Sequence, residues 1–273
     1  MRPAGWLGEA LLLTLLAVAP ALAAAAPAAR TPAASAAAAT QPSAHWGPIE
    51  SRIESGYFQQ NAADLTALAA TLAGDGGVAA GGRSDTEWRS YYAALLAYRL
   101  ALLAKGDEAR AWPFTQQCVN RLNRALVRDT TSAEALALQA ACLALQSHLD
   151  PWRSPIAAPL SLARIDKALK LAPDNPRVLL LGARAAAERP ALFGGDSQQA
   201  FALLQRAVAA FERQRGPAGG LPQWGAADAF TDLARDYLGL GDALAARNVL
   251  ERALLVAPDF GQARRLMAEI VTG

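Results

Sequence analysis

Apolar and small residues recur at helical spacing in the stretch from Ala227 to Phe260. They fall at Phe230, Leu233, Ala234, Tyr237, Ala246, Leu250, Ala253 and Pro258. Steps of three and four residues place side chains on one face of a helix. Gly241-Asp242 interrupts the pattern with residues typical of a tight turn. The stretch therefore predicts two helices joined by a short turn and ended at Pro258.

The same periodicity predicts helices along most of the chain. The further predicted helices span 49–60, 64–72, 85–104, 108–128, 132–146, 160–171, 176–188, 197–212 and 261–271. Hydrophobic residues make up 53% of the sequence and are mostly Ala and Leu, whereas aromatic residues make up 7%. Ala and Leu are strong helix formers, and strand-forming runs are scarce. The predicted fold class is all-α.

The N-terminus has the pattern of a secretory signal. An apolar run from Ala10 to Ala19 is followed by the small-x-small sequence Ala21-Leu22-Ala23. We predict a cleaved signal peptide over 1–23, a periplasmic or secreted protein, and no stable membrane span after cleavage. The alternative is an uncleaved anchor in the inner membrane. Glu9 and Pro20 leave the run shorter than the roughly 20 residues that a span needs.

Differences in composition divide the rest of the chain into two predicted segments. Residues 24–45 are rich in Ala and Pro and have almost nothing to bury, which predicts a disordered tether. Residues 46–273 form the predicted repeat domain. Within it, 46–84 is a degenerate N-terminal hairpin that caps one end of a stack, 85–260 holds the repeats, and 261–273 is a capping helix.

A basic, a small and an apolar residue recur near four helix ends. These are Arg124-Ala125-Leu126, Lys167-Ala168-Leu169, Arg206-Ala207-Val208 and Arg252-Ala253-Leu254. The Ala lets neighbouring helices approach closely. This pattern resembles the tetratricopeptide repeat (TPR), a helix–turn–helix unit of about 34 residues, here lengthened by insertions. The resemblance implies a right-handed helical-repeat solenoid of TPR-like hairpins.

Two further motifs are similar to those of bacterial exported TPR proteins. They are the turn Pro190-Ala191-Leu192-Phe193-Gly194-Gly195-Asp196 and the later Trp224-Gly225. The resemblance implies a location in the cell envelope and no particular activity. The residues themselves predict a tight turn with positive φ at Gly and with Asp196 capping the next helix.

In a stack of hairpins the first helices form a concave wall. The register places Asp228, Thr231 and Arg235 outward on this wall, and Arg177 and Arg184 lie seven residues apart on one face. These arginines suit a peptide carboxylate or an acidic segment. The alternative is a solvated face with pairs such as Arg184 with Glu188. The helical register within 176–188 can be assigned in two ways that differ by one residue.

The connections 148–159 and 190–196 are predicted to be enlarged loops on one edge of the stack. Together they would form a lip over one end of the groove. Trp152 and Trp224 lie in irregular segments, and each either anchors its segment to the core or contacts a partner.

Cys118 and Cys142 are the only two cysteines and lie at equal distances from a predicted turn near Thr130. An oxidising periplasm would favour a disulfide between them. Two small buried thiols in an Ala-rich core are the alternative.

The sequence offers no nucleophile–base pair, and its two histidines, His45 and His148, do not form a metal motif. A net charge of +2 gives no reason to expect nucleic acid. We therefore predict a non-catalytic periplasmic scaffold or adaptor, without cofactor or metal, that binds a peptide or partner protein in a concave helical groove. The alternative is a periplasmic small-ligand-binding TPR protein with loops 148–159 and 190–196 covering the groove.

Overall fold

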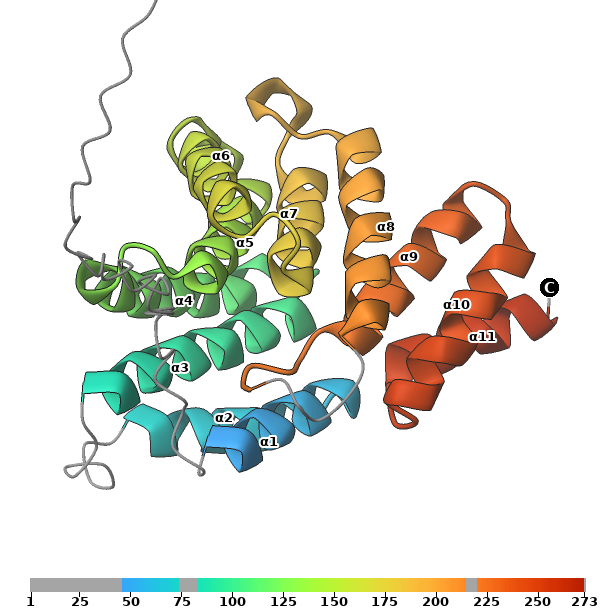
Figure 1. Ribbon diagram of the computed structural model, residues 1–273, viewed down its shortest axis with the longest axis horizontal. Coiled ribbons are helices and arrows are strands. Elements are labelled where there is room, and N and C mark those ends of the chain that lie inside the picture. Colours follow the sequence, from blue (N-terminus) through green and yellow to red (C-terminus); the bar gives the residue numbers. More distant parts are fainter. Residues whose placement is uncertain (1–45, 74–82, 215–219, 273) are drawn as a thin grey trace, which may run out of the picture. The chain divides into compact units, whose positions relative to one another are not determined.

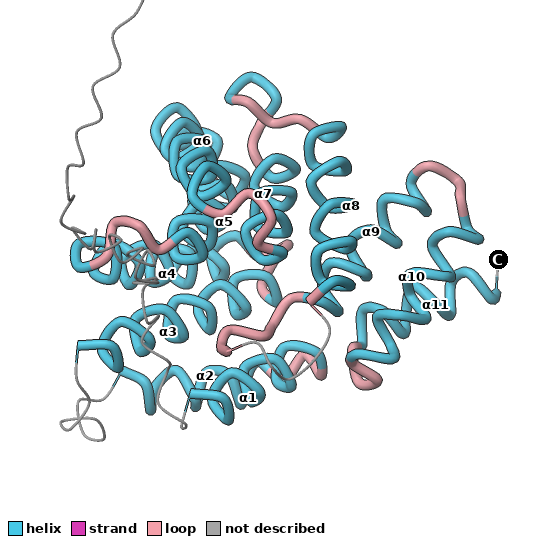
Figure 2. Tube along the Cα trace, viewed as in Figure 1, coloured by secondary structure: helices cyan, strands magenta, loops and turns pink. Residues whose placement is uncertain are grey.

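The computed structural model describes residues 46–73, 83–214 and 220–272, and these ranges contain helices and no strand (Figures 1 and 2). The α-helices are α1 (Trp46–Phe58), α2 (Ala62–Ala73), α3 (Arg83–Leu103), α4 (Glu108–Arg128), α5 (Ala133–Leu149), α6 (Ser154–Leu171), α7 (Pro176–Glu188), α8 (Ser197–Arg213), α9 (Ala226–Gly239), α10 (Ala243–Val256) and α11 (Gly261–Thr272). The predicted signal 1–23 and tether 24–45 lie outside the described residues.

Successive helices pack as pairs, α3 with α4, α5 with α6, α7 with α8, and α9 with α10 (Figure 1). This arrangement confirms the predicted all-α fold of helical hairpins. Helix α5 is buried along most of its length because α4, α6 and α7 all pack on it. Small residues permit that closeness. The Ser161 hydroxyl of α6 donates a 2.8 Å hydrogen bond to the main-chain oxygen of Ala140 in α5.

The predicted turns are confirmed by their backbone geometry. Gly106, Gly194 and Gly241 have φ values of 103°, 83° and 79°, a region that glycine enters without steric cost. Asp196 and Asp242 then accept hydrogen bonds from main-chain N–H groups in the first turns of α8 and α10. These side chains satisfy donors that have no partner within the helix.

The predicted loop 148–159 is mostly helical, so its expected extent is wrong. Helix α5 continues to Leu149, a 3-10 turn (η1) spans Pro151–Arg153, and α6 begins at Ser154. Pro155 lies in the first turn of α6, where a helix does not need the missing N–H. Pro159 removes one hydrogen bond from the helix interior without ending it.

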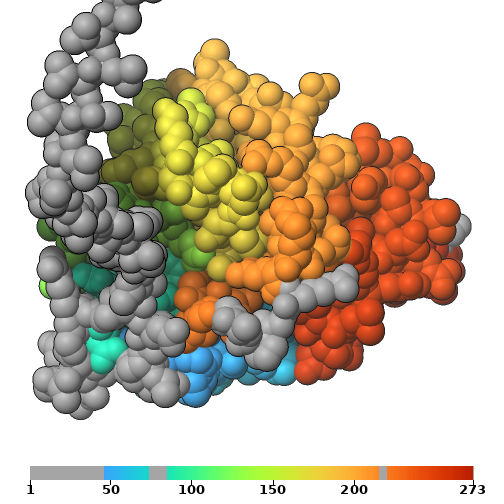
Figure 3. All heavy atoms as spheres, viewed as in Figure 1, coloured from blue at the N-terminus to red at the C-terminus, as the bar shows by residue number. Residues whose placement is uncertain are grey.

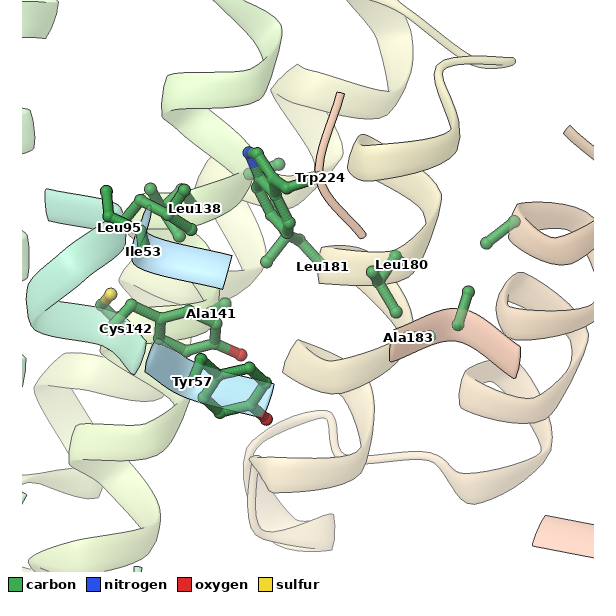
Figure 4. Close-up of a cluster of buried hydrophobic side chains, with 14 of the residues drawn as sticks. Ile53, Tyr57, Leu95, Leu138, Ala141, Cys142, Leu180, Leu181, Ala183 and Trp224 are labelled. Carbon is green, nitrogen blue, oxygen red and sulfur yellow. The ribbon is translucent and has the colours of Figure 1, made fainter. Parts of the chain in front are cut away.

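The N-terminal hairpin does not simply cap one end of the stack, which corrects the sequence prediction. Ile53 and Tyr57 of α1 lie among buried side chains of α3, α5 and α7 (Figure 4). At the end of α1, the rings of Phe58 and Phe260 have centroids 4.5 Å apart. Helix α1 therefore covers the inner face, by which we mean the side of α3, α5, α7 and α9 that faces α1.

The segment just before α9 covers the inner face as well. The main-chain N–H of Gln223 donates a 2.8 Å hydrogen bond to Glu50 in α1. Figure 3 shows atoms of this segment beside those of the N-terminal hairpin. The side chain of Trp224 is buried in the same core cluster (Figure 4). The groove predicted to hold a partner is therefore largely filled by the chain's own residues.

Candidate functional site

A buried arginine joins three helices at the centre of the inner face. Arg99 of α3 has no exposed surface. Its guanidinium donates to both oxygens of Asp228 in α9 at 2.7 and 2.8 Å, and to both oxygens of Glu54 in α1 at 2.8 Å. The ring of Tyr57 lies under the guanidinium, with 4.1 Å from Cζ to the ring centroid. Charged hydrogen bonds and a cation–π contact thus satisfy this cation away from water.

The ion network continues from Asp228 toward solvent. Arg184 of α7 donates through Nη2 to Asp228 at 2.8 Å and through Nε to Asp232 at 2.7 Å. Arg235, which is half-exposed, donates to the other oxygen of Asp232 at 2.9 Å. The network therefore links the core to the surface along α9.

The three carboxylates of this network share its arginines unequally, and Arg235 gives Asp232 a second partner. Arg99 and Arg184 face three carboxylates, those of Glu54, Asp228 and Asp232. Burial raises the pKa of Glu54 to about 7 in spite of the opposing attraction of Arg99. Burial would also raise the pKa of Asp228, but Arg99 and Arg184 outweigh it and lower the pKa to about 2. Glu54 is thus the carboxylate that gains a proton first as the pH falls.

A second polar cluster holds the other end of α1. The Tyr92 hydroxyl donates to Glu50 at 2.7 Å. Close to it, Arg177 and Asn175 donate to Glu134 at 2.8 and 2.7 Å. This cluster ties α1, α3, α5 and α7 together, so its charges serve internal packing.

A pocket of about 390 Å³ opens where the first network reaches the surface. Helices α3, α7, α8 and α9 supply most of its wall. The lining residues are Tyr57, Tyr98, Leu102, Lys105, Ala183, Arg184, Ala187, Glu188, Ser197, Ala200, Leu204, Asp232, Arg235, Asp236 and Gln262. Alanines of α7 and α8 leave the space, two tyrosines supply aromatic surface, and charges of both signs surround them.

Asp236 is the unmatched acid of this pocket. Within the described residues its carboxylate has no hydrogen bond or ion pair, whereas Glu188 pairs with Lys105, and Asp232 with Arg184 and Arg235. Burial, together with the charge of Asp232, raises the pKa of Asp236, and the charge of Arg235 offsets this rise only in part. A cationic group beside Asp236 would lower that pKa and stabilise the carboxylate.

A second pocket of about 620 Å³ adjoins the first and shares Leu102, Lys105 and Gln262 with it. Its other lining residues include Gln60 at the end of α1 and Phe114 of α4. Leu102 and Lys105, near the end of α3, therefore line both pockets.

The structure buries most of the residues that we expected to face an open groove. Asp228 and Thr231 are buried, so the prediction that they point outward is wrong, and Asp228 accepts hydrogen bonds from Arg99 of α3 and Arg184 of α7. Arg177 is buried as well, and Arg184 pairs with Asp228 and Asp232 rather than with Glu188. Arg235 is the exposed member of the set and lines the pocket.

Sequence reasoning missed Glu54, Arg99, Tyr98 and Asp236. Arg99 interrupts the apolar run of α3. A charge inside such a run is the signal that would have indicated a buried ion pair.

The two loop tryptophans have opposite environments. Trp224 is buried, and its indole N–H donates to the Tyr91 hydroxyl at 3.1 Å, so it anchors its segment. Trp152 is almost fully exposed, so it is not an anchor. The loop 190–196 packs on α6 through its 3-10 turn (Ala191–Phe193), and Arg189, just before the loop, donates to the Ser161 hydroxyl of α6 at 3.3 Å. Neither this loop nor 148–159 contributes a side chain to the pocket as described.

Cys118 of α4 and Cys142 of α5 form a disulfide with a Cα–Cα distance of 6.4 Å. His148 lies 3.6 Å from Glu188, and His45 is outside the described residues. In the described ranges no three His, Cys, Asp or Glu side chains are grouped to hold a metal ion. No helix in those ranges has the length and apolar character needed to cross a membrane.

Comparisons with known proteins bear on the fold of this chain. No family model matches this chain, and no curated protein matches it. Among solved structures, the chain is similar to the HusA haemophore from Porphyromonas gingivalis. The TM-score is 0.55 at 21% identity, over 71% of this chain and 92% of that chain. The chain thus shares an all-helical fold with a protein of that name.

Proposed function

We propose that this protein is a non-catalytic, TPR-like binding protein that holds a peptide segment of a partner in the pocket between α3, α7, α8 and α9. The observation that carries the proposal is the unmatched, half-buried carboxylate of Asp236 on the wall of an open pocket. The expected ligand is a segment with a basic side chain or a terminal amine.

The dimensions of the pocket support this proposal. Its volume of about 390 Å³ lies within the range of known ligand sites, and the adjoining 620 Å³ extends it for a longer ligand. Tyr57 and Tyr98 provide aromatic surface against which an alkyl stem or a cation would pack. The ion pairs of Asp232 hold the wall in position before a ligand arrives.

A small ligand is the alternative occupant, and the haemophore likeness suggests haem as an example. The residues of the pocket do not fit haem well. Its described lining offers Tyr57 and Tyr98 as iron ligands, and burial raises the pKa of both, which disfavours the phenolate. Asp236 would also repel the propionates of haem.

The disulfide supports placing this function outside the cytoplasm. Bonds of this kind persist in oxidising compartments and are rare where thiols are kept reduced. Within the proposal, the protein acts in the periplasm or is secreted after its signal is removed.

Fluorescence anisotropy tests the proposal with two labelled peptides, one alternating Ala with Lys and one alternating Ala with Glu. We expect saturable binding of the Lys peptide and weaker binding of the Glu peptide. Asp236→Asn should weaken Lys-peptide binding by about tenfold, because it removes one charge-assisted hydrogen bond from a half-buried site.

Glu251→Gln is the matched control, because Glu251 is exposed and pairs with Arg247 on α10 away from the pocket. Equal binding of both peptides, or unchanged binding by Asp236→Asn, would argue against the proposal. A haem titration followed at the Soret band separates the alternative. A saturable change in Soret absorbance with one-to-one stoichiometry would identify haem, rather than a peptide, as the ligand.

A further inference from the structure

Helix α6 carries an exposed apolar ridge on the side that faces away from α5. Trp152, in the 3-10 turn before α6, is 93% exposed, and Ile156 and Leu160 are 71% and 46% exposed. Pro155 and Pro159 between them are also exposed. Ile156 and Leu160 are four residues apart and so share one face of α6, and Trp152 precedes them in the 3-10 turn that leads into the helix. These side chains form a continuous ridge rather than scattered surface residues, and such a ridge usually marks an interaction surface.

The opposite face of α6 packs into the core. Ala157, Ala158, Ser161, Ile165 and Ala168 are buried there, and α6 packs against α5 (Figure 1). The core therefore does not need the ridge. The pocket proposed above takes no residue from α6, so the ridge is a separate surface.

Basic residues continue and flank this ridge. Lys167 and Lys170 follow it along the same face by helical spacing, and both are exposed. Arg164 lies beside the ridge, and these three cations have no hydrogen bond or ion pair within the described residues. Asp166 is the one acidic residue within α6.

Arg153 lies at the tip of the ridge and is held in an ion pair with Asp150. It donates to Asp150 at 3.1 Å, and its guanidinium stacks over the ring of Trp112 at 4.9 Å. The ridge thus presents Trp, Ile and Leu at one end and cations at the other.

We propose that this ridge docks the protein on the surface of an anionic lipid membrane. Trp152 and Ile156 enter the headgroup region, where the amphipathic indole is favoured. Lys167 and Lys170 attract lipid phosphates, and Arg164 adds to that attraction. The contact is peripheral and requires no spanning helix.

Charge favours a membrane over a second copy of the chain. In a two-fold symmetric dimer the same patch meets itself. A parallel pairing would bring the cations of one copy against those of the other, and an antiparallel pairing would set them against the apolar end of the other copy. In both cases Asp166 is the one acidic side chain that α6 offers. An anionic surface complements the same charges.

Co-sedimentation of the full chain with vesicles tests this inference. One set contains neutral phosphatidylcholine only, and the other includes about 30% anionic phosphatidylglycerol. We expect the protein to pellet with the anionic vesicles and to stay largely in solution with the neutral ones. Trp152→Ala should reduce the bound fraction at least fivefold, and the double variant Lys167→Glu with Lys170→Glu should do the same.

Leu255→Ala is the matched control, because Leu255 is an equally exposed apolar residue on α10. It should bind like the wild type. Circular dichroism checks that each variant is folded. Absence of binding to anionic vesicles, or equal binding by Trp152→Ala, would overturn the inference. A dimer in lipid-free sedimentation that Trp152→Ala abolishes would assign the ridge to a second copy instead.

Discussion

At the residue scale, the three carboxylates of the ion network share its three arginines unequally. Asp228 contacts Arg99 and Arg184, and Asp232 contacts Arg184 and Arg235. Glu54 contacts one arginine, Arg99, and so has fewer cationic partners than the two aspartates. Burial therefore raises the pKa of Glu54, whereas two arginine partners outweigh burial and lower the pKa of Asp228.

Stability should depend on pH through Glu54. Its pKa in the folded state is about 7, above the ordinary value of 4.5. The folded protein therefore binds more protons than the unfolded chain between these values. The stabilisation is complete below about pH 4.5 and is lost as the pH rises through about 7. Urea unfolding at pH 5 and pH 8 should show a lower midpoint at pH 8.

Glu54→Gln should remove part of that difference between pH 5 and pH 8. The rest remains because burial also raises the pKa of Glu50. Glu251→Gln, on the exposed face of α10, should keep the wild-type difference. A variant Glu54→Gln with the full wild-type slope would contradict the assignment.

At the scale of single helices, the residue where a helix begins and its position in the fold have separate causes. The aspartates that begin α4, α8 and α10 act through hydrogen bonds within their own first turns. The position of α1, in contrast, depends on contacts with α3, α5, α7 and Phe260, none of which is local to α1. Local chemistry therefore sets where each helix begins, and tertiary contacts set where it lies.

The α4–α5 hairpin should lose stability without its disulfide. Cys118 and Cys142 are separated by 24 residues, so the bond restricts the unfolded chain. The double variant Cys118→Ser with Cys142→Ser should lower the free energy of unfolding by about 3 kcal/mol by the loop-entropy relation. Reduction of the wild type should have a similar effect. Alkylation under non-reducing conditions, read by mass spectrometry, checks the bond, and two free thiols would contradict it.

At the scale of the whole molecule, Arg99 connects distant parts of the chain. It bonds Glu54, 45 residues earlier, and Asp228, 129 residues later. Tyr57, next to Arg99, also lines the pocket. Docking of α1 and the shape of the proposed binding site therefore depend on the same ion network.

Arg99→Met should weaken both stability and binding. The substitution leaves two buried carboxylates without their main partner, which typically costs about 3–5 kcal/mol. Lys-peptide binding should fall as well, because α1 then holds Tyr57 less firmly. Arg247→Met, which breaks an exposed pair on α10, should change stability by about 0.5 kcal/mol or less. Equal effects of the two substitutions in urea unfolding would contradict the central role of Arg99.

The sequence was sufficient to predict the elements. Helical periodicity and an Ala- and Leu-rich composition identified the all-α class, and the spans of most helices agree within a few residues. The glycine turns and the aspartate caps were also predictable, because each depends on the chemistry of a few neighbouring residues. The predicted end of α5 and start of α6 are wrong, because proline in the first turn of a helix gives the same sequence pattern as proline in a loop.

Only the tertiary structure shows which face of the helical hairpins is exposed to solvent. A solvated repeat face and one covered by α1 have the same local pattern, so sequence could not show that Asp228 and Thr231 are buried. It also could not pair Arg99 with a residue 129 positions away. The exposure of Trp152 and the unmatched charge of Asp236 depend on which groups approach them after folding. Burial and charge balance are sums over distant neighbours, whereas helix formation depends on near ones.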